Sequence, residues 1–230
     1  IMASIPGALM IGVDRLDYTK GLTLRLEAYQ RFLAANPAWR GKITYLQITP
    51  KSRSQIKEYA EMEDQVNATA GRINGTYSDA SWSPMRYVNR PYSRTALSGL
   101  YRGARVALVT PLRDGMNLVA KEYVAAQDAA NPGALILSRF AGAAAEFREG
   151  ALLVNPYDPD HVAGTIARAM AMPLAERKGR HAALYAALFN NDVSEWGEKF
   201  LSALMGTTRF NLKDAASLSR SGFEALSTRH

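Results

Sequence analysis

The stretch from Thr110 to Glu122 combines an Asp-Gly turn with the start of a helix, and this combination can bind an anion. Residues 104–109 form a short run of apolar and β-branched side chains, which predicts a buried strand. Residues 118–127 are rich in good helix formers, which predicts a helix. Gly115 can adopt a positive φ in a tight turn, so free backbone N–H groups lie at the positive end of the helix dipole. Phosphate is a common occupant of such a site.

Glu122 lies four residues after Leu118, so both side chains share one helical face behind the turn. A carboxylate has the wrong sign to bind phosphate, but it can accept hydrogen bonds from sugar hydroxyls, as the acidic residue of a nucleotide-binding βα unit does. A plain turn with a solvated Glu122 explains this stretch equally well, because strand–turn–helix connections occur throughout α/β proteins.

Arg15 and Lys20 lie in the loop that follows the first predicted strand, with Gly21 at the next helix start. Two cations that face a helix N-terminus would hold a diphosphate and stabilise charge on a leaving phosphate. The alternative is that both are ordinary surface residues. The histidines lack a carboxylate or serine partner by spacing, and no cluster has the spacing of metal ligands, so no metal is predicted.

The composition is that of an ordinary globular protein: 230 residues, 47% hydrophobic and 21% charged, with no cysteine. No run of eighteen apolar residues and no secretory leader is present, so we expect a cytoplasmic protein without a membrane partner. The net charge of +7 suggests acidic partners, either nucleic acid or phosphorylated small molecules. Because cations are mixed with acids along the chain, nucleic-acid binding is the weaker inference.

Strands are predicted to alternate with helices along the chain. The expected strands are 8–13, 42–48, 85–88, 104–109, 134–137 and 152–154. A helix after the first strand carries Leu22, Leu26, Tyr29 and Leu33 on one face, and the helix expected last carries Val193, Trp196, Phe200 and Leu204. Another helix, 54–73, is expected to place Ile56, Tyr59, Ala60, Val66, Ala70 and Ile73 inward and to stop at Asn74-Gly75.

This alternation predicts an α/β fold with a doubly wound, mostly parallel sheet over residues 1–205, followed by a polar tail, 206–230, expected to be disordered or foreign to the fold. Ligands of such sheets bind at the carboxyl ends of the strands. The loops expected on that rim are 14–21, 49–53, 89–93, 110–117 and 138–144.

Three separated segments together resemble the trehalose-6-phosphate synthase family. They are Arg15-Leu16-Asp17-Tyr18-Thr19-Lys20-Gly21, Gly71-Arg72-Ile73-Asn74-Gly75 and the stretch from Val109 to Tyr123. Residues 140–144 and 154–158 fit the same family. The likeness covers residues 8–204, and three motifs in the right order are hard to obtain by chance.

The resemblance implies a retaining glycosyltransferase of the GT-B type, built from two Rossmann-like domains that face each other across a cleft. Family members transfer glucose from UDP-glucose, or another nucleotide-glucose, to glucose 6-phosphate, with an α,α-1,1 bond formed and the nucleotide released. This chain resembles the C-terminal, donor-binding half. Family enzymes use no metal, and the nucleotide-sugar is a substrate, so the resemblance implies no cofactor.

The resemblance also assigns catalytic and donor-binding residues. Arg15 and Lys20 match the pair that grips the donor diphosphate, and Asp114 matches the residue that holds the transferred glucose. The rest of the nucleotide-sugar segment is Gly115, Met116, Asn117, Leu118 and Val119.

Four other residues match positions around the rest of the two substrates. Glu122 matches the acid that binds the ribose hydroxyls, and Ile48 and Tyr92 match positions near the base and ribose. Arg53 matches an arginine that reaches the acceptor phosphate.

The family's N-terminal domain, which supplies most acceptor contacts, has no counterpart in this chain, so we expect the isolated chain to lack turnover. Within the family, a glucosylglycerol-phosphate synthase or a pseudo-glycosyltransferase that makes a C–N bond would use a similar donor half. Outside the enzymes, the alternative function is a non-catalytic module that binds a nucleotide-sugar. Nucleotide preference stays open, as does assembly into a homo-oligomer.

Overall fold

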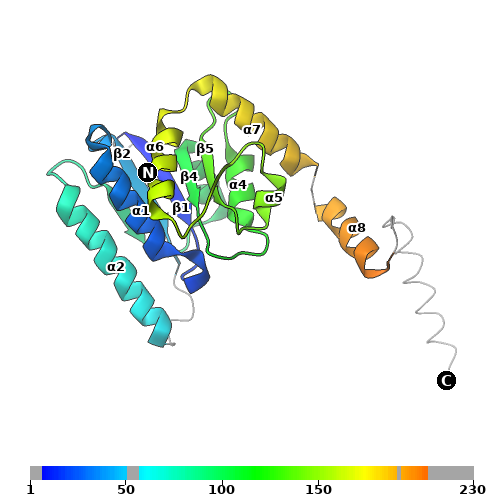
Figure 1. The fold of residues 1–230 in the computed structure, drawn as a ribbon, viewed down its shortest axis with the longest axis horizontal. Helices are drawn as coiled ribbons and strands as arrows, with labels where there is room; N and C mark the ends of the chain where they lie inside the picture. The colour runs from blue at the N-terminus through cyan, green and yellow to red at the C-terminus, as the bar shows by residue number, and fades with distance from the viewer. Residues whose placement is uncertain (1–6, 51–56, 191–192, 207–230) are drawn as a thin grey trace. The chain divides into compact units, whose positions relative to one another are not determined.

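The computed structural model describes residues 7–50, 57–190 and 193–206. Within these residues, six parallel strands form a single sheet in the order β3-β2-β1-β4-β5-β6 (Figure 1). The strands are β1 (Ala8–Val13), β2 (Ile43–Ile48), β3 (Met85–Val88), β4 (Ala104–Val109), β5 (Ala134–Ser138) and β6 (Leu152–Val154). Each predicted strand is confirmed, because short apolar runs bounded by turn residues are a strong strand signal.

Helices cover both faces of the sheet. On one face lie α1 (Leu22–Ala35), α2 (Lys57–Tyr77) and α6 (Pro159–Ala171), and on the other α3 (Arg94–Gly103), α4 (Leu118–Ala126) and the short α5 (Ala143–Glu146) (Figure 1). Two 3-10 turns, Tyr18–Lys20 and Pro37–Trp39, flank α1. Met10 belongs to the core cluster that contains the buried faces of α1, α2 and α6, whereas its neighbours Leu9 and Ile11 are buried on the opposite side of the sheet.

The strand order places a reversal point between β1 and β4. From β1 the chain winds outward through β2 to β3, and then it returns to the middle and winds the other way through β4, β5 and β6. The connections after β1 and β4 therefore leave in opposite directions, and a crevice opens between them at the carboxyl ends of the strands. This topology confirms the predicted doubly wound sheet and identifies the two loops that bound the crevice.

The helix α2 differs from its prediction at its end and in one inward position. It continues to Tyr77 through Asn74-Gly75, so the predicted stop is wrong. Asn74 instead serves tertiary structure, since its amide group donates to the carbonyl of Met85 at 3.0 Å and accepts from the Met85 N–H at 3.1 Å. Ala60 is exposed rather than inward, while Ile56 lies outside the described residues.

The remaining inward residues predicted for α2 are buried: Tyr59, Val66, Ala70 and Ile73. In the loop predicted at 140–144, the last two residues already belong to α5. None of the described helices is long and apolar enough to cross a membrane.

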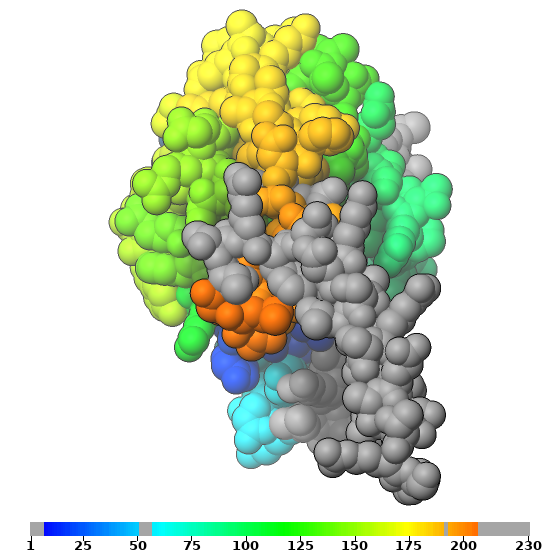
Figure 2. Space-filling view, turned by 90° about the vertical axis from the view of Figure 1, so that its right-hand side faces the viewer, coloured from blue at the N-terminus to red at the C-terminus, as the bar shows by residue number. Residues whose placement is uncertain are grey.

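The chain divides into two compact units, Ile1–Ala186 and Ala187–His230. α7 (Leu174–Phe189) spans the boundary and lies at the surface in the space-filling view, where it is drawn in gold (Figure 2). In the second unit, α8 (Val193–Leu204) carries the predicted apolar face, and the rings of Trp196 and Phe200 stack with centroids 5.4 Å apart. The predicted domain end at residue 205 stays a prediction.

We expect Arg177 to be a structural anchor of α7, because it is only 8% exposed and donates to the carbonyls of Asn131 (side chain, 2.9 Å) and Pro132. Arg177→Ala should lower the free energy of unfolding by about 2–4 kcal/mol, since it leaves buried acceptors unpaired and opens a cavity. Urea unfolding followed by circular dichroism measures this loss. The neighbouring Lys178 is exposed, so Lys178→Ala should change stability by less than about 0.5 kcal/mol, and equal losses in the two variants would contradict the assignment.

Candidate functional site

Three of the predicted rim loops are joined by backbone hydrogen bonds. The N–H of Leu112 donates to the carbonyl of Thr19 at 2.7 Å, which ties the loop after β4 to the loop after β1. The N–H of Asp114 donates to the carbonyl of Phe140, and the N–H of Gly142 donates to the carbonyl of Asp114, each at 3.2 Å. The loops 14–21, 110–117 and 138–144 therefore form one continuous rim, as the sequence predicts.

Two glycines allow these loops to approach so closely. Gly21 has φ of 63°, and a Cβ there would lie 2.8 Å from the side chain of Leu112. At Gly142 a Cβ would lie 1.7 Å from the carbonyl oxygen of Gly115, a distance that no real side chain occupies. The glycines at the first helix start and in the small-residue loop thus serve backbone packing around the crevice.

The start of α4 presents backbone donors to the crevice. Asn117 adopts a left-handed conformation with φ of 64°, and its side chain accepts from the Ala120 N–H at 3.0 Å as an N-cap. Within the described residues, the N–H groups of Gly115, Met116 and Leu118 donate to no acceptor, and all three residues are exposed. These N–H groups lie at the positive end of the helix dipole, which is the arrangement that binds an anion.

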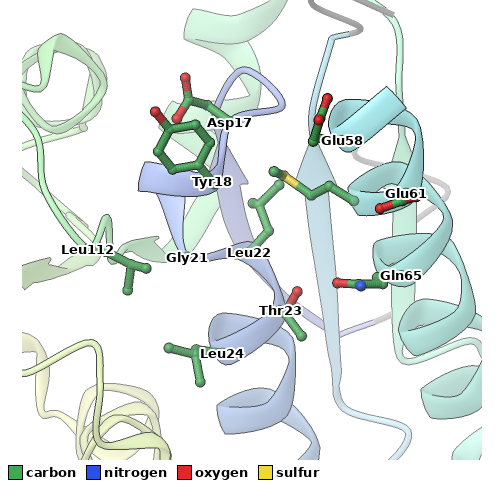
Figure 3. A pocket seen from close by; sticks show the side chains of 11 residues that line it. Asp17, Tyr18, Gly21, Leu22, Thr23, Leu24, Glu58, Glu61, Gln65 and Leu112 are labelled. Carbon is green, nitrogen blue, oxygen red and sulfur yellow. The ribbon is translucent and has the colours of Figure 1, made fainter. Parts of the chain in front are cut away.

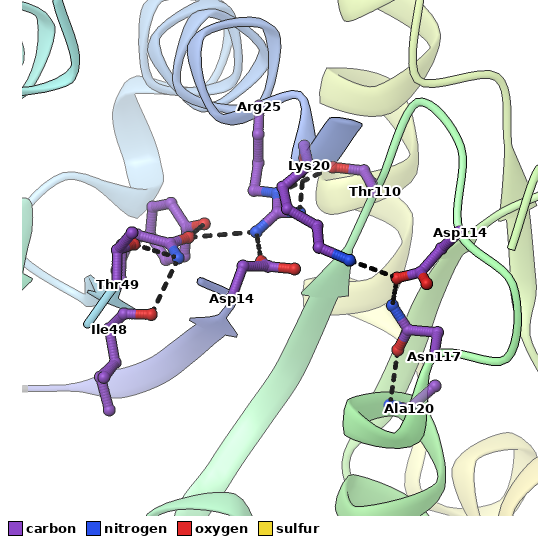
Figure 4. A network of polar contacts seen from close by, with 11 residues as sticks. Asp14, Lys20, Arg25, Ile48, Thr49, Thr110, Asp114, Asn117 and Ala120 are labelled. Carbon is purple, nitrogen blue, oxygen red and sulfur yellow. Dashed lines mark hydrogen bonds and ion pairs between the residues drawn. The ribbon is translucent and has the colours of Figure 1, made fainter. Parts of the chain in front are cut away.

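Lys20 and Asp114 meet across the crevice. The Lys20 Nζ donates to the Asp114 carboxylate at 2.7 Å, with the side chains only 14% and 18% exposed. The same carboxylate accepts from the amide of Asn117 at 2.9 Å (Figure 4). Because an ammonium group has three donors, Lys20 can hold Asp114 and still bind a phosphate oxygen. Arg15 is exposed on the same loop.

Beneath this pair lies a buried network centred on Arg25, a residue that the sequence analysis missed. Its guanidinium donates to the carboxylate of Asp14, and its Nε donates to the Thr110 hydroxyl at 2.9 Å (Figure 4). It also donates to the side-chain oxygen of Gln47 at 3.2 Å and to the carbonyl of Lys20 at 3.1 Å. Arg25 lies three residues after Leu22 and therefore shares the apolar face of α1. A charged residue on an apolar helix face could have indicated a buried ion pair.

Burial shifts the proton affinity of both members of this ion pair. Burial raises the pKa of Asp14, and the Arg25 guanidinium opposes that rise. Burial alone would lower the pKa of Arg25, but the charge and hydrogen bond of Asp14, together with Tyr45, outweigh burial and the pKa is raised. Arg25 therefore remains a charged donor at every working pH.

The residues predicted to bind ribose and base differ in exposure. Glu122 is exposed and accepts a long hydrogen bond, 3.4 Å, from the Tyr101 hydroxyl. Burial and the Glu122 charge both raise the pKa of Tyr101, so its hydroxyl keeps the proton that it donates. Tyr92 is half-buried, and the guanidinium of Arg90 lies over its ring, 5.5 Å from the ring centroid.

Of two further predicted residues, one is buried and the other lies outside the described residues. The Ile48 side chain is 1% exposed, so only its backbone can meet a ligand, and its carbonyl already accepts from the N–H of Asp14 at 3.0 Å. Arg53 lies outside the described residues, so its assignment to an acceptor phosphate stays a prediction.

A cavity of about 360 Å³ lies beside this rim, between α2 and the start of α1 (Figure 3). Asp17, Glu58 and Glu61 line it together with apolar side chains such as Leu22 and Met62. Three carboxylates repel a phosphate, and none of the predicted site residues is in the lining. The lining of this cavity is therefore unsuited to a phosphate, whereas the crevice between β1 and β4 offers cations and free N–H groups.

The histidines do not contribute to the crevice among the described residues. The ring of His181 is buried and lies 3.3 Å from the carbonyl of Val124, and His161 is exposed on α6. His230 lies outside the described residues. In the part of the chain that the structure describes, no group of three or more acidic or histidine side chains could hold a metal ion.

Sequence comparison relates the chain to one enzyme family. Residues 4–206 match glycosyltransferase family 20. A trehalose-6-phosphate synthase of Sinorhizobium fredii is 58% identical over 201 residues, which is 87% of this chain and 43% of the relative. One from Enterobacter sp. is 51% identical over 199 residues, or 86% of this chain and 42% of the relative. The chain thus spans less than half the length of these curated relatives.

Solved structures agree with this relationship. An α,α-trehalose-phosphate synthase from Burkholderia xenovorans in complex with glucose-6-phosphate has a TM-score of 0.84 and 48% identity, covering 89% of this chain and 44% of that chain. A protein from E. coli bound with UDP-2-fluoro glucose has the same TM-score and identity, with 91% and 46% coverage.

Asn117 should matter to stability through both its cap and its backbone conformation. Asn117→Ala should lower the free energy of unfolding by about 2 kcal/mol, because it loses the cap and places alanine in a left-handed conformation. Asn117→Gly keeps that conformation without strain, so its loss should stay below about 1 kcal/mol. Chemical denaturation of the two variants decides the point, and equal losses would show that the left-handed backbone carries no cost.

Proposed function

Since the chain belongs to glycosyltransferase family 20, we propose that it supplies the donor-binding half of a retaining hexosyltransferase that makes α,α-trehalose 6-phosphate. The donor is a nucleotide-glucose, UDP-glucose in the first place, and the acceptor is glucose 6-phosphate. The names of the relatives and the ligands of the two solved structures support this choice of substrates. The observation that carries the proposal is that the Lys20–Asp114 ion pair and the free N–H groups at the start of α4 lie in the loops at the reversal point of the sheet.

The donor diphosphate binds between the first rim loop and the start of α4. Lys20 and Arg15 supply positive charge from one side, and the N–H groups of residues 115–118 supply donors from the other. Both sets stabilise the negative charge that develops on the leaving diphosphate as the glycosidic bond breaks. Asp114, held by Lys20 and Asn117, accepts hydrogen bonds from hydroxyl groups of the transferred glucose.

The nucleoside lies farther along the rim. The exposed carboxylate of Glu122 binds the ribose hydroxyls, because a carboxylate accepts hydrogen bonds from hydroxyl groups but repels phosphate. Tyr92 and the backbone of Ile48 lie near the base and ribose, and Arg53 reaches the acceptor phosphate. Val119 continues the donor segment behind Leu118.

The reaction that we propose needs no metal and no cofactor, because the cations and N–H groups of the chain take over the neutralisation of the diphosphate. The bond between the glucose anomeric carbon and the phosphate oxygen breaks, and a bond from the same carbon to the acceptor oxygen forms on the same face. The acceptor hydroxyl gives its proton to the leaving phosphate oxygen, so charge balances without a separate base.

The acceptor site requires more protein than this chain contains. The chain covers 43% of its Sinorhizobium relative, and an N-terminal domain in such enzymes would form the other wall of the cleft. We therefore propose that the chain alone binds the nucleotide donor and transfers glucose only together with such a domain.

Calorimetric titration with UDP, GDP and ADP in the presence of EDTA tests the donor site. One nucleotide should bind, and Lys20→Ala should weaken its binding by about tenfold or more, because a charge-assisted hydrogen bond is lost and the Asp114 carboxylate is left without its cation beside the phosphate. Arg15→Ala should have a smaller effect, since Arg15 is exposed. Lys178→Ala is the matched control for loss of a surface cation, and binding that is unchanged in Lys20→Ala would sink the assignment.

The role of Glu122 can be isolated by changing the ligand and the protein together. The parent chain should bind UDP about fivefold or more tightly than the nucleotide that lacks the ribose 2′-hydroxyl, because that hydroxyl donates to a carboxylate. In Glu122→Gln this preference should fall to within about twofold. A variant that keeps the full preference would show that the ribose hydroxyl binds elsewhere.

A further inference from the structure

We propose that Arg25 is a positioning residue that fixes Lys20 and the loop 110–117 relative to each other for diphosphate binding. The inference rests on the proposed function, which makes the distance between these two elements important. It concerns a side chain that is 1% exposed and cannot touch a ligand itself.

Arg25 is bonded to both walls of the crevice. Its terminal nitrogen donates to the carbonyl of Lys20 at 3.1 Å, and its Nε donates to the hydroxyl of Thr110, the first residue after β4, at 2.9 Å. The loop after β1 and the loop after β4 are therefore attached to one rigid group, as Figure 4 shows. A guanidinium is planar with fixed N–H directions, so it sets orientation as well as distance.

The other nitrogen of the guanidinium anchors it to the sheet. It donates to the carboxylate of Asp14, the first residue after β1, and to the side-chain oxygen of Gln47 on β2 at 3.2 Å. The position of Arg25 is thus set by the adjacent strands β1 and β2, and it transmits that position to Lys20 and Thr110. All of these partners are more than nine-tenths buried except Lys20, whose bond is made by the backbone.

The consequence for binding lies in the Lys20–Asp114 contact. The carbonyl that Arg25 holds belongs to Lys20 itself, and Asp114 lies four residues after Thr110. If the Thr110 tether is lost, the two ends of the 2.7 Å contact can shift apart, and the N–H groups of residues 115–118 shift with Asp114. Binding groups must hold their geometry within about 0.5 Å to act together, so even a small shift weakens the site.

Thr110 is the place to test this, because changing Arg25 would leave the buried Asp14 carboxylate unpaired and unfold the protein. Thr110→Val keeps the shape of the side chain and removes the acceptor, while Thr110→Ser keeps the hydroxyl. Thr44→Val is the matched control: Thr44 is 0% exposed on β2, and its hydroxyl has no hydrogen-bond partner among the described residues.

Two readouts are needed on the full chain: the Kd for UDP at a temperature where melting curves show every variant folded, and hydrogen–deuterium exchange of residues 110–117 without nucleotide. Thr110→Val should weaken UDP binding by at least about fivefold, the ratio for one lost hydrogen bond, and speed exchange in 110–117. Thr110→Ser and Thr44→Val should stay within about twofold of the parent in both readouts.

A Thr110→Val variant with parental Kd and parental exchange would overturn the proposal, even if its melting temperature fell, because a purely structural role lowers stability without changing the folded site. The exchange readout also separates this proposal from the proposed function. If the parent chain binds no nucleotide, the donor-site proposal is rejected. Faster exchange of residues 110–117 in Thr110→Val would then still show that Arg25 holds this loop through Thr110.

Discussion

The buried ion pair of Arg25 with Asp14 is the interaction on which the arrangement of the site depends. Removing two charges from water costs several kcal/mol for each ion, and the cost is offset only where further hydrogen bonds complete the pair. Here Thr110, Gln47 and the Lys20 carbonyl complete it, so the carboxyl ends of β1, β2 and β4 are held at fixed distances. These bonds tie the loops after β1 and β4 together from beneath.

The chemistry of the crevice follows from the placement of opposite charges above that network. Lys20 and the free N–H groups at the start of α4 can attract a diphosphate, while the carboxylates of Asp114 and Glu122 can accept hydrogen bonds from hydroxyl groups. A nucleotide-sugar matches this arrangement of charges, because its diphosphate lies between the hydroxyl groups of the ribose and those of the sugar. The adjacent cavity, lined by Asp17, Glu58 and Glu61, lacks the positive charge that such a ligand needs.

Local pattern was sufficient to predict the strands, the doubly wound sheet and three loops that share its rim, because apolar runs and glycine turns act over a few residues. It was insufficient where a side chain serves a distant partner. Asn74 reads as a helix stop, yet it bonds to Met85 and the helix continues. Arg25 stands on an apolar face, but its partner Thr110 is 85 residues away, and spacing alone does not reveal it. The role of Ile48 came from family likeness, and burial limits it to the backbone.

The most direct test of the central claim is the amide NMR spectrum of the ¹⁵N-labelled chain during titration with UDP. The account predicts that the largest shift changes fall on the N–H groups of residues 115–118, because these donors lie free at the start of α4 and meet the diphosphate. Unchanged signals for those residues, with changes gathered instead around Glu58 and Glu61 on α2, would place the ligand in the acidic cavity and contradict the account.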